Sequence, residues 1–288
     1  MKQFRVVAET DRNYPMGLTI DGKRIHVSVK WPGSACSLVL TEEQGETAPE
    51  LRQGDVWNLT LETDRQIKGC FVYGFQTEQG WLPDPYGKVF RGREIWGAET
   101  GFKRKLETVA GQTVFEWGED KRPQIPYEDC VIYKAHVRGF TKHPSSHVRD
   151  RGTFRAVMEK IPYMKELGVT TLELMPVTEF NEVREETEVR MVKLPVDNQP
   201  PKLNYWGYGD SFLFAPKTSY SSGRRKHPDT ELKTLVRELH KNNMELILEL
   251  YVSGKEDPSM VLDAVRYWAR EYHIDGIHLV GDAPLKLI

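Results

Sequence analysis

The chain has few cysteines and no long apolar run. Among its 288 residues, Cys36, Cys70 and Cys130 are widely spaced and form no CxxC pair. This spacing gives neither a paired metal-binding motif nor a disulfide framework, so we expect reduced thiols. No stretch approaches the ~18 consecutive apolar residues of a membrane-spanning helix, and the apolar run after Met1 is too short for a signal peptide. We therefore expect a cytoplasmic protein with no membrane partner.

The chain also lacks an excess of charge of either sign. Its 40 basic and 42 acidic residues give a formal net charge of -2. Binding to nucleic acid or to a membrane surface depends on clustered positive charge, so this balance predicts neither partner. The hydrophobic content of 39% is ordinary for a globular protein, and the length predicts two domains.

Short strands separated by turns are predicted for residues 1–118. Turn signals at residues 21–22, 32–33, 54–55 and 78–80 interrupt runs that are rich in β-branched and aromatic residues. The strands are expected over residues 4–8, 18–20, 24–29, 37–40, 56–62 and 69–75. Strands at this spacing are typical of an all-β sandwich.

Strands alternate with helices in the predicted second domain, residues 119–288. Apolar residues recur at three- and four-residue steps in three helices, the first of which holds Pro162 and is expected to bend or break there. The helices are expected over residues 153–167, 228–242 and 258–272, and near-continuous apolar strands over residues 130–137, 169–177, 244–252 and 274–280. A long charged loop is expected over residues 181–203. This alternation is typical of parallel β/α units.

Four β/α units make the first half of a (β/α)8 barrel of the TIM type. A half barrel exposes the hydrogen-bonding groups of its edge strands and the inner face of its sheet. The sequence therefore predicts either the front part of a longer protein or a half barrel that self-associates through its open edges.

Five motifs share the order and approximate spacing of one enzyme family. They cover residues 83–88 (PDPYGK), 125–141 (IPYEDCVIYKAHVRGFT), 152–155 with 167–177 (GTFR, LGVTTLELMPV), 204–208 (NYWGY, with FAP and SYS after it) and 275–280 (DGIHLV). Together they resemble the isoamylase and pullulanase branch of the α-amylase superfamily, glycoside hydrolase family 13. The resemblance implies a β-sandwich like carbohydrate-binding module 48 and an α-glucan substrate or ligand resembling starch, glycogen or pullulan. It implies no cofactor and no metal.

The chain departs from this family at the residues that carry the chemistry. In the family the fourth barrel strand reads roughly D-G-F-R-F-D, in which the arginine orients the sugar and the last aspartate attacks it. Asp275 and Gly276 match, but His278 stands at the arginine position and Val280 at the nucleophile position. In the third strand, Glu249 stands for aspartate, and residues 253–254 (SG) replace an Asn-His pair that helps to bind the sugar. In the first strand, the family's usual glutamate is lysine here, at position 134.

Valine cannot act as the nucleophile of a glycosidase. Retaining hydrolysis needs two carboxyl groups about 5 Å apart, one as nucleophile and one as acid and base. Asp282 is a weak substitute for Val280, because it points the same way but lies two residues, roughly 6–7 Å, farther along the strand. The resemblance therefore implies a glycoside hydrolase by family, in which this chain has no confident catalytic residue.

Sugar binding is easier to predict than sugar cleavage. Trp206 and Tyr208 lie with Asn204 on a loop at the C-terminal end of a strand, where barrel enzymes place their sites. His278 is expected either to bind a ligand hydroxyl or to be structural, and Glu249 is expected to pair with a cation. Tryptophans 31, 57 and 81 are expected to pack in the core rather than form a glucan platform.

Three hypotheses follow from these observations. The chain is part of a debranching or amylase-type hydrolase, a non-catalytic α-glucan-binding protein, or an oligomerising half-barrel scaffold. A carboxylate pair in further sequence favours the first, its absence favours the second, and a stable oligomer without glucan affinity favours the third.

Overall fold

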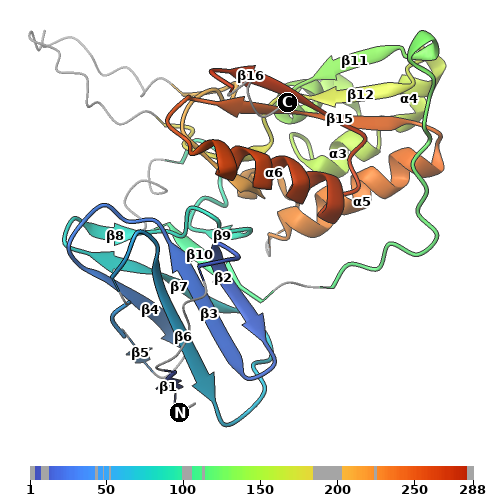
Figure 1. The fold of residues 1–288 in the computed structure, drawn as a ribbon. Helices are drawn as coiled ribbons and strands as arrows, with labels where there is room; N and C mark the ends of the chain where they lie inside the picture. The colour runs from blue at the N-terminus through green and yellow to red at the C-terminus, as the bar shows by residue number, and fades with distance from the viewer. Residues whose placement is uncertain are drawn as a thin grey trace, which may run out of the picture.

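The protein folds into two bodies joined by an extended segment (Figure 1). The computed structural model describes residues 4–7, 13–42, 45–47, 49–51, 53–98, 106–111, 114–183, 203–223 and 226–283. Most of the long loop predicted over residues 181–203, and the end of the chain from residue 284, lie outside the described residues. Among the described residues, no helix has both the length and the apolar character needed to cross a bilayer.

The first body consists of two antiparallel sheets around one core. The first sheet has the order β1 (Phe4–Val6), β6 (Trp57–Thr63), β3 (Arg24–Val29), β2 (Gly17–Asp21). The second has the order β5 (Gly45–Thr47), β4 (Cys36–Glu42), β7 (Phe71–Thr77), β10 (Glu107–Ala110), β9 (Phe90–Arg91), with β8 (Gly80–Leu82) paired to β7. Val27 and Trp57 of one sheet share a buried cluster with Leu38 and Phe75 of the other. The six predicted strands are present within two residues of their expected bounds, whereas the short strands β5, β8, β9 and β10 were missed.

The tryptophans at positions 31, 57 and 81 were predicted to pack in the core, and Trp57 is buried there. Trp57 is buried in the shared core, and its indole Nε1 donates to the backbone oxygen of Trp31 at 2.9 Å. Trp31 is partly buried against the same core. Trp81 donates its Nε1 to the backbone oxygen of Leu106 at 2.7 Å. Each of these two bonds ties neighbouring segments of one sheet together.

The turn at residues 83–88 is built around a buried carboxylate. Asp84 is fully buried and accepts hydrogen bonds from the Tyr73 hydroxyl at 2.7 Å, from the Leu18 backbone N–H at 3.1 Å and from the Tyr86 backbone N–H at 2.8 Å. Burial raises its pKa above the usual value, against the effect of these donors. This network explains why the motif needs an aspartate here, since the carboxylate satisfies donors from both sheets.

The second body contains a parallel sheet with strands in chain order. These are β11 (Ile132–Ala135), β12 (Thr171–Leu174), β15 (Glu245–Val252) and β16 (Gly276–Gly281). The intervening helices are α2 (Val137–Thr141), α3 (Phe154–Met158), α4 (Ile161–Glu166), α5 (Pro228–Lys241) and α6 (Pro258–Glu271). An antiparallel pair, β13 (Thr178–Phe180) and β14 (Ser211–Pro216), and three 3-10 turns (Tyr127–Asp129, Pro144–Ser146, Thr218–Tyr220) complete it. Antiparallel sheets followed by a parallel α/β sheet agree with the predicted fold class at this coarse level.

The structure decides two details of this body that the sequence had left open or misplaced. The helical segment predicted over residues 153–167, with a bend or a break at Pro162, is broken into two helices, α3 and α4, and Pro162 lies in the first turn of α4, where its missing N–H costs nothing. The first strand is shorter than the predicted 130–137, because Val137 already begins α2. Its cap is His136, whose ring Nδ1 accepts the Gly139 backbone N–H at 2.9 Å.

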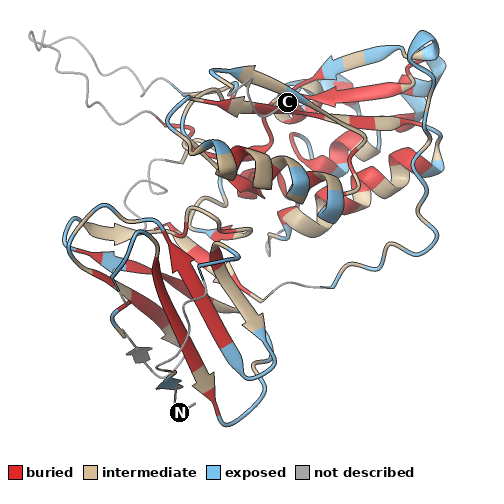
Figure 2. Cartoon of the chain, viewed as in Figure 1, coloured by how far each residue is buried: buried red, intermediate tan, exposed pale blue. Residues whose placement is uncertain are grey.

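The near-continuous apolar character predicted for the parallel strands holds for only one of their two faces. Leu172, Leu174, Leu246 and Leu248 point into the core shared with the helices, so buried residues gather between sheet and helices (Figure 2). The alternate residues point to the opposite face, and several of them carry charge. A near-continuous apolar run therefore describes only the helix-facing half of each strand.

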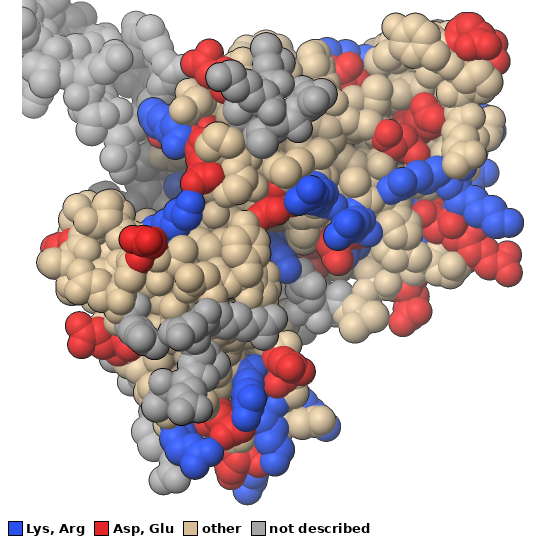
Figure 3. Space-filling view, viewed as in Figure 1, with Lys and Arg blue, Asp and Glu red and all other residues tan. Residues whose placement is uncertain are grey.

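Aromatic contacts join the two bodies. The ring centroids of Phe90 and Phe212 lie 4.3 Å apart, and those of Tyr86 and Phe214 lie 5.2 Å apart. The Thr218 hydroxyl donates to the backbone oxygen of Phe90 at 3.2 Å. On the face drawn in Figure 3, basic and acidic side chains are interspersed over both bodies, in keeping with the near-neutral net charge.

Candidate functional site

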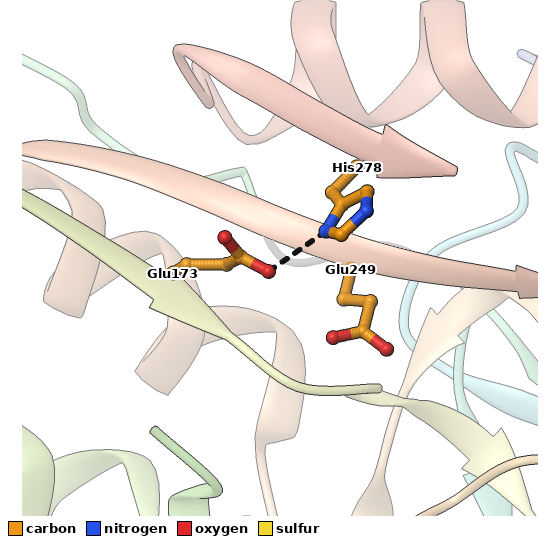
Figure 4. Close-up of side chains that lie close together, drawn as sticks. All are labelled: Glu173, Glu249 and His278. Carbon is orange, nitrogen blue, oxygen red and sulfur yellow. Dashed lines mark hydrogen bonds and ion pairs between the residues drawn. The ribbon is translucent and has the colours of Figure 1, made fainter. Parts of the chain in front are cut away.

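Four charged or ionisable side chains meet on the face of the parallel sheet that the helices do not cover. Strand register places Lys134 of β11 opposite Glu173 of β12, and Glu249 of β15 opposite His278 of β16. Lys134 Nζ lies 3.1 Å from Glu173 Oε1 and forms a second ion pair with Glu249. His278 Nδ1 lies 2.9 Å from the same oxygen of Glu173 (Figure 4). Each of the four strands thus contributes one member to a single network, which we call the inner-face cluster.

Electrostatic contacts in the inner-face cluster stabilise the charged forms of Lys134 and Glu173. Burial disfavours the charge of Lys134, but the two carboxylates outweigh burial and raise its pKa above the usual value. Burial also disfavours the charge of Glu173, and here His278 and Lys134 outweigh it and lower the pKa. The side chain of Glu249 is fully buried, whereas those of Lys134 and His278 are 41% and 51% exposed. The inner-face cluster is therefore a charged patch in which Glu249 is buried while Lys134 and His278 are partly exposed to solvent.

The ion pair predicted for Glu249 is present, with Lys134 as the cation. His278 was predicted to be either structural or ligand-binding, and it has both a partner, Glu173, and a half-exposed ring. Sequence reasoning identified Lys134 only as a departure from the family and did not single out Glu173 at all. The alternation of each strand was the available signal, but the cluster appears only when the register between strands is known.

The loop at residues 204–209 is fixed by its own hydrogen bonds. The Asn204 side chain accepts the Gly207 backbone N–H at 3.2 Å and donates to the Tyr208 backbone oxygen at 3.0 Å. Gly207 has φ +84° and packs against Phe180, so a side chain there would clash. Asn204, predicted to bind substrate, therefore has its amide committed to the shape of the loop that carries Trp206 and Tyr208.

Tyr208 connects this loop to the inner-face cluster. Burial and the negative charge of Glu249 raise the pKa of its hydroxyl to about 12. Its ring also lies 5.6 Å from that of Tyr251 on β15, in an edge-on arrangement. Tyr208 is thus a neutral phenol beside the buried carboxylate of Glu249, where the loop meets the inner-face cluster.

Trp206 is the exposed aromatic of the same loop. Its side chain is 52% exposed, while its neighbour Tyr205 is stacked on His136 with ring centroids 4.6 Å apart. The His136 ring also meets Trp206 edge-on, with ring centroids 5.7 Å apart. Its Nε2 is hydrogen-bonded to the Tyr220 hydroxyl at 2.9 Å. An anchored aromatic with a solvent-facing ring is what stacking on a sugar requires, so the structure keeps Trp206 as a candidate contact.

His136 is expected to stay neutral at physiological pH. Burial lowers its pKa to about 4, and its Nδ1 already accepts a backbone N–H. Because the unfolded chain takes up this proton near pH 6.5, acidification from about pH 6.5 to pH 4 favours unfolding, by up to about 3 kcal/mol for this group. Urea denaturation at pH 7.5 and pH 5 should show a smaller loss of stability in His136→Gln than in the unmodified chain. The exposed His143→Gln should retain the full loss, and an equal loss in all three proteins would contradict this assignment.

The position of the family's nucleophile carries no acid in this fold. Val280 pairs in register with Tyr251 near the end of β16. Asp282, the weak substitute, is exposed beyond the strand, and its backbone N–H donates to the Val252 backbone oxygen at 2.9 Å. Its side chain lies against Gly254, where an added Cβ would come within 2.9 Å of the Asp282 Cβ. Asp282 therefore packs on the turn after β15.

The turn after β15 is closed by its own side chains. Ser253 donates its hydroxyl to Glu256 Oε1 at 2.9 Å and its backbone N–H to Glu256 Oε2 at 3.0 Å. The positions that resemble the family's Asn-His pair thus form a short turn with a carboxylate cap. No amide or imidazole is available at either of these two positions to bind a sugar.

Comparison with known proteins identifies relatives of one kind. No family model matches the chain. It is 29% identical over 303 aligned residues to isoamylase 3 of Oryza sativa subsp. japonica, a chloroplastic protein, with 83% of this chain and 37% of the relative covered. It is 28% identical over 345 residues to the glycogen operon protein GlgX homolog of Mycobacterium tuberculosis, with 91% and 46% covered. The chain thus spans less than half the length of these curated relatives.

Solved structures of similar fold include a pullulanase from Paenibacillus barengoltzii in complex with maltohexaose and α-cyclodextrin. The TM-score is 0.68 at 21% identity, over 93% of this chain and 48% of the pullulanase. The catalytic module of the glycogen-degrading pneumococcal virulence factor SpuA gives a TM-score of 0.69 at 22% identity, over 93% and 46%. The resemblance to the isoamylase and pullulanase branch of glycoside hydrolase family 13, inferred from the motifs, is confirmed.

Proposed function

We propose that this chain binds α-glucan with the fold of a debranching glycoside hydrolase and does not itself cleave glycosidic bonds. Residues 1–118 would be a β-sandwich of the carbohydrate-binding-module-48 type, and residues 119–288 the first four strands of a (β/α)8 barrel. The relatives support the substrate class, since they include isoamylases and a glycogen operon protein. Cytoplasmic localisation remains a prediction from the sequence.

The observation that carries the absence of cleavage is the inner-face cluster beside Val280. Within this cluster, Glu173 is paired with Lys134 and His278, and Glu249 is paired with Lys134. The ion pairs lower the pKa of Glu173 and so make it a poor proton donor. With valine at the nucleophile position, no described group of this face is placed to form a glycosyl-enzyme intermediate.

Turnover of pullulan and amylopectin by purified residues 1–288 tests the absence of cleavage. We expect no release of reducing ends above a protein-free blank, with an active debranching enzyme as the positive control. Measurable turnover that follows the purified chain would refute the proposal and would point to Asp282 or to a different register of β16. Val280→Asp in the same assay probes that register, because a gain of activity would place position 280 at the reacting sugar.

Glucan binding is expected to depend on the exposed ring of Trp206. Loss of one well-placed aromatic contact costs more than about 1 kcal/mol, so Trp206→Ala should weaken the affinity for maltoheptaose about tenfold in a calorimetric titration. Tyr127→Ala is the matched control, since Tyr127 is 90% exposed and lies before the N-terminal end of β11, at the opposite end of the sheet. Equal losses in both variants, or no binding by the unmodified chain, would contradict a glucan site at this loop.

The alternative is a scaffold that self-associates through the open edges of the parallel sheet. β11 and β16 each pair with only one neighbour among the described strands. Edge strands of this kind can pair with another chain. Light scattering coupled to size-exclusion chromatography distinguishes the two functions, because a stable oligomer without glucan affinity favours the scaffold and a glucan-binding monomer favours the proposal.

A further inference from the structure

We propose that Glu173, Glu249 and His278 form a binding site for a first-row divalent cation, best matched by Zn²⁺, for which the ammonium of Lys134 competes. The inference rests on the inner-face cluster alone and is independent of glucan binding. Each of the three residues offers one ligand atom, and these atoms lie within 4.8 Å of one another. They come from three adjacent strands, β12, β15 and β16, so the backbone holds them together (Figure 4).

The geometry is close to that of a metal site. Ligand atoms at about 2.0–2.2 Å from Zn²⁺ are necessarily less than about 4.4 Å apart. The separations in the cluster therefore need only small side-chain rotations to converge on one ion. One imidazole and two carboxylates match Zn²⁺ and its first-row neighbours better than Mg²⁺ or Ca²⁺, which prefer oxygen ligands alone.

The carboxylates of the cluster already pair with one positive charge, the ammonium of Lys134. The Lys134 ammonium forms ion pairs with both carboxylates, yet its side chain is 41% exposed and lies on the edge strand β11, so it can move out into solvent. One ammonium leaves the two carboxylates with a residual negative charge, which a divalent ion would neutralise. Glu249 provides a second indication, because both of its carboxylate oxygens are buried without a hydrogen bond of good geometry, although the Lys134 ammonium and the Tyr208 hydroxyl lie close to them. A buried carboxylate that is incompletely satisfied is costly, and metal coordination is one of the arrangements that satisfies it.

Access to the site comes from His278. Its side chain is 51% exposed, while its Nδ1 is turned toward Glu173. An ion arriving from solvent would meet the imidazole and Glu173 first and reach Glu249 as Lys134 leaves. Three protein ligands leave further coordination positions open, within reach of water and of the neighbouring Tyr208 hydroxyl.

Calorimetric titration of the untagged, metal-free chain with ZnCl₂ in a non-chelating buffer at pH 7.5 tests the proposal. We expect one ion per chain. His278→Ala should weaken binding by at least about tenfold, since the loss of even an outer hydrogen-bond partner costs ten- to a hundredfold at metal sites. Lys134→Gln should strengthen it about fivefold, because a competing ion pair of about 1 kcal/mol is removed.

Two controls separate this site from other zinc-binding groups. His143→Ala removes an exposed histidine away from the cluster, and Cys70→Ser removes the exposed thiol. Both should bind as the unmodified chain does. Binding that survives His278→Ala unchanged, that is lost in Cys70→Ser, or that is absent from the unmodified chain would overturn the proposal.

A second measurement covers the case in which Lys134→Gln folds poorly. Zn²⁺ should raise the melting temperature of Lys134→Gln more than that of the unmodified chain, because an ion bound only by the folded state stabilises it. Co²⁺ should give the intense visible absorption of a low-symmetry site that includes an imidazole. An equal thermal shift in His278→Ala and Lys134→Gln would contradict the assignment.

Discussion

Replacing Lys217 with methionine should lower the free energy of unfolding by about 3–5 kcal/mol, the cost of breaking a buried ion pair by removing one partner. The Lys217 side chain is fully buried and directly follows β14, which pairs with β13. Its Nζ lies 2.6 Å from Glu179 Oε1 and 3.0 Å from Glu182 Oε1, and it donates to the Phe180 backbone oxygen at 2.9 Å. Methionine keeps the length of the side chain, so the loss would come from charge and not from a cavity.

The two carboxylates that Lys217→Met leaves behind would be poorly compensated. Glu179 keeps the Thr218 backbone N–H at 2.7 Å and a distant Arg93 at 3.9 Å, and Glu182 keeps the Ser219 hydroxyl at 2.9 Å. These contacts do not replace a full positive charge in a site that excludes water. Neutralising one carboxylate at the same time, as in Lys217→Met with Glu179→Gln, should therefore recover part of the loss.

Urea denaturation followed by circular dichroism measures this effect. Lys241→Met is the matched control, since Lys241 pairs with Glu238 at the surface with its side chain 58% exposed, and surface pairs contribute about 0–1 kcal/mol. A loss below about 1 kcal/mol for Lys217→Met would show that water enters this site and screens the carboxylates. An equal loss in the double variant would show that hydrogen bonding, rather than charge, accounts for the cost.

The position of this lysine matters for the candidate site as well as for stability. β13 and β14 flank the segment that carries Trp206, and Phe180, which packs on Gly207, lies between Glu179 and Glu182. The ring of Phe180 is also 4.8 Å from Lys217 Nζ. The buried ion pairs of Lys217 with Glu179 and Glu182 therefore fix the base of the loop. We expect Lys217→Met to weaken glucan binding as well, because it would shift Trp206.

The elements of the fold were largely predictable from the sequence, because their signals are local. The periodicity of α5 and α6 and the turn residues of the first body fix where elements begin and end. One error has a local cause as well. The first barrel strand was predicted too long, because the His136 ring caps the next helix and so ends the strand early.

The candidate site was predictable only in part, because it depends on the register between strands. His278, Val280 and Glu249 were found through their place in family motifs. Glu173 was not, because one glutamate in an apolar strand has no local signal that distinguishes an ion-pair partner from a solvent-exposed residue. Only the pairing of β11 with β12 shows that Lys134 faces Glu173. The relation of Asn204 to its own loop was equally hidden, since an asparagine that binds sugar and one that holds a turn have the same sequence context.

The register suggests that two departures from the family compensate each other. The usual glutamate of the first strand is Lys134 here, and the usual arginine of the fourth strand is His278, so the cation that faces Glu173 and Glu249 comes from β11 instead of β16. If the positive charge has moved between strands, Lys134→Glu should be harmful alone and tolerated together with His278→Arg. This hypothesis explains why a lysine occurs at position 134 of the first strand, and it can be tested.

Lys134→Glu should destabilise the protein by about 2–3 kcal/mol, because it adds a third carboxylate to Glu173 and Glu249 and removes their cation; the half-exposed position keeps the cost below that of a fully buried pair. Lys134→Glu with His278→Arg should recover at least half of this loss, since the guanidinium would start from a residue that already reaches Glu173. Lys68→Glu, an exposed charge reversal in a loop, should change stability by no more than about 0.5 kcal/mol. Urea midpoints at pH 7.5 measure all three. A double variant that is no more stable than Lys134→Glu alone would show that the two positions are not coupled, and that the lysine serves only the first strand.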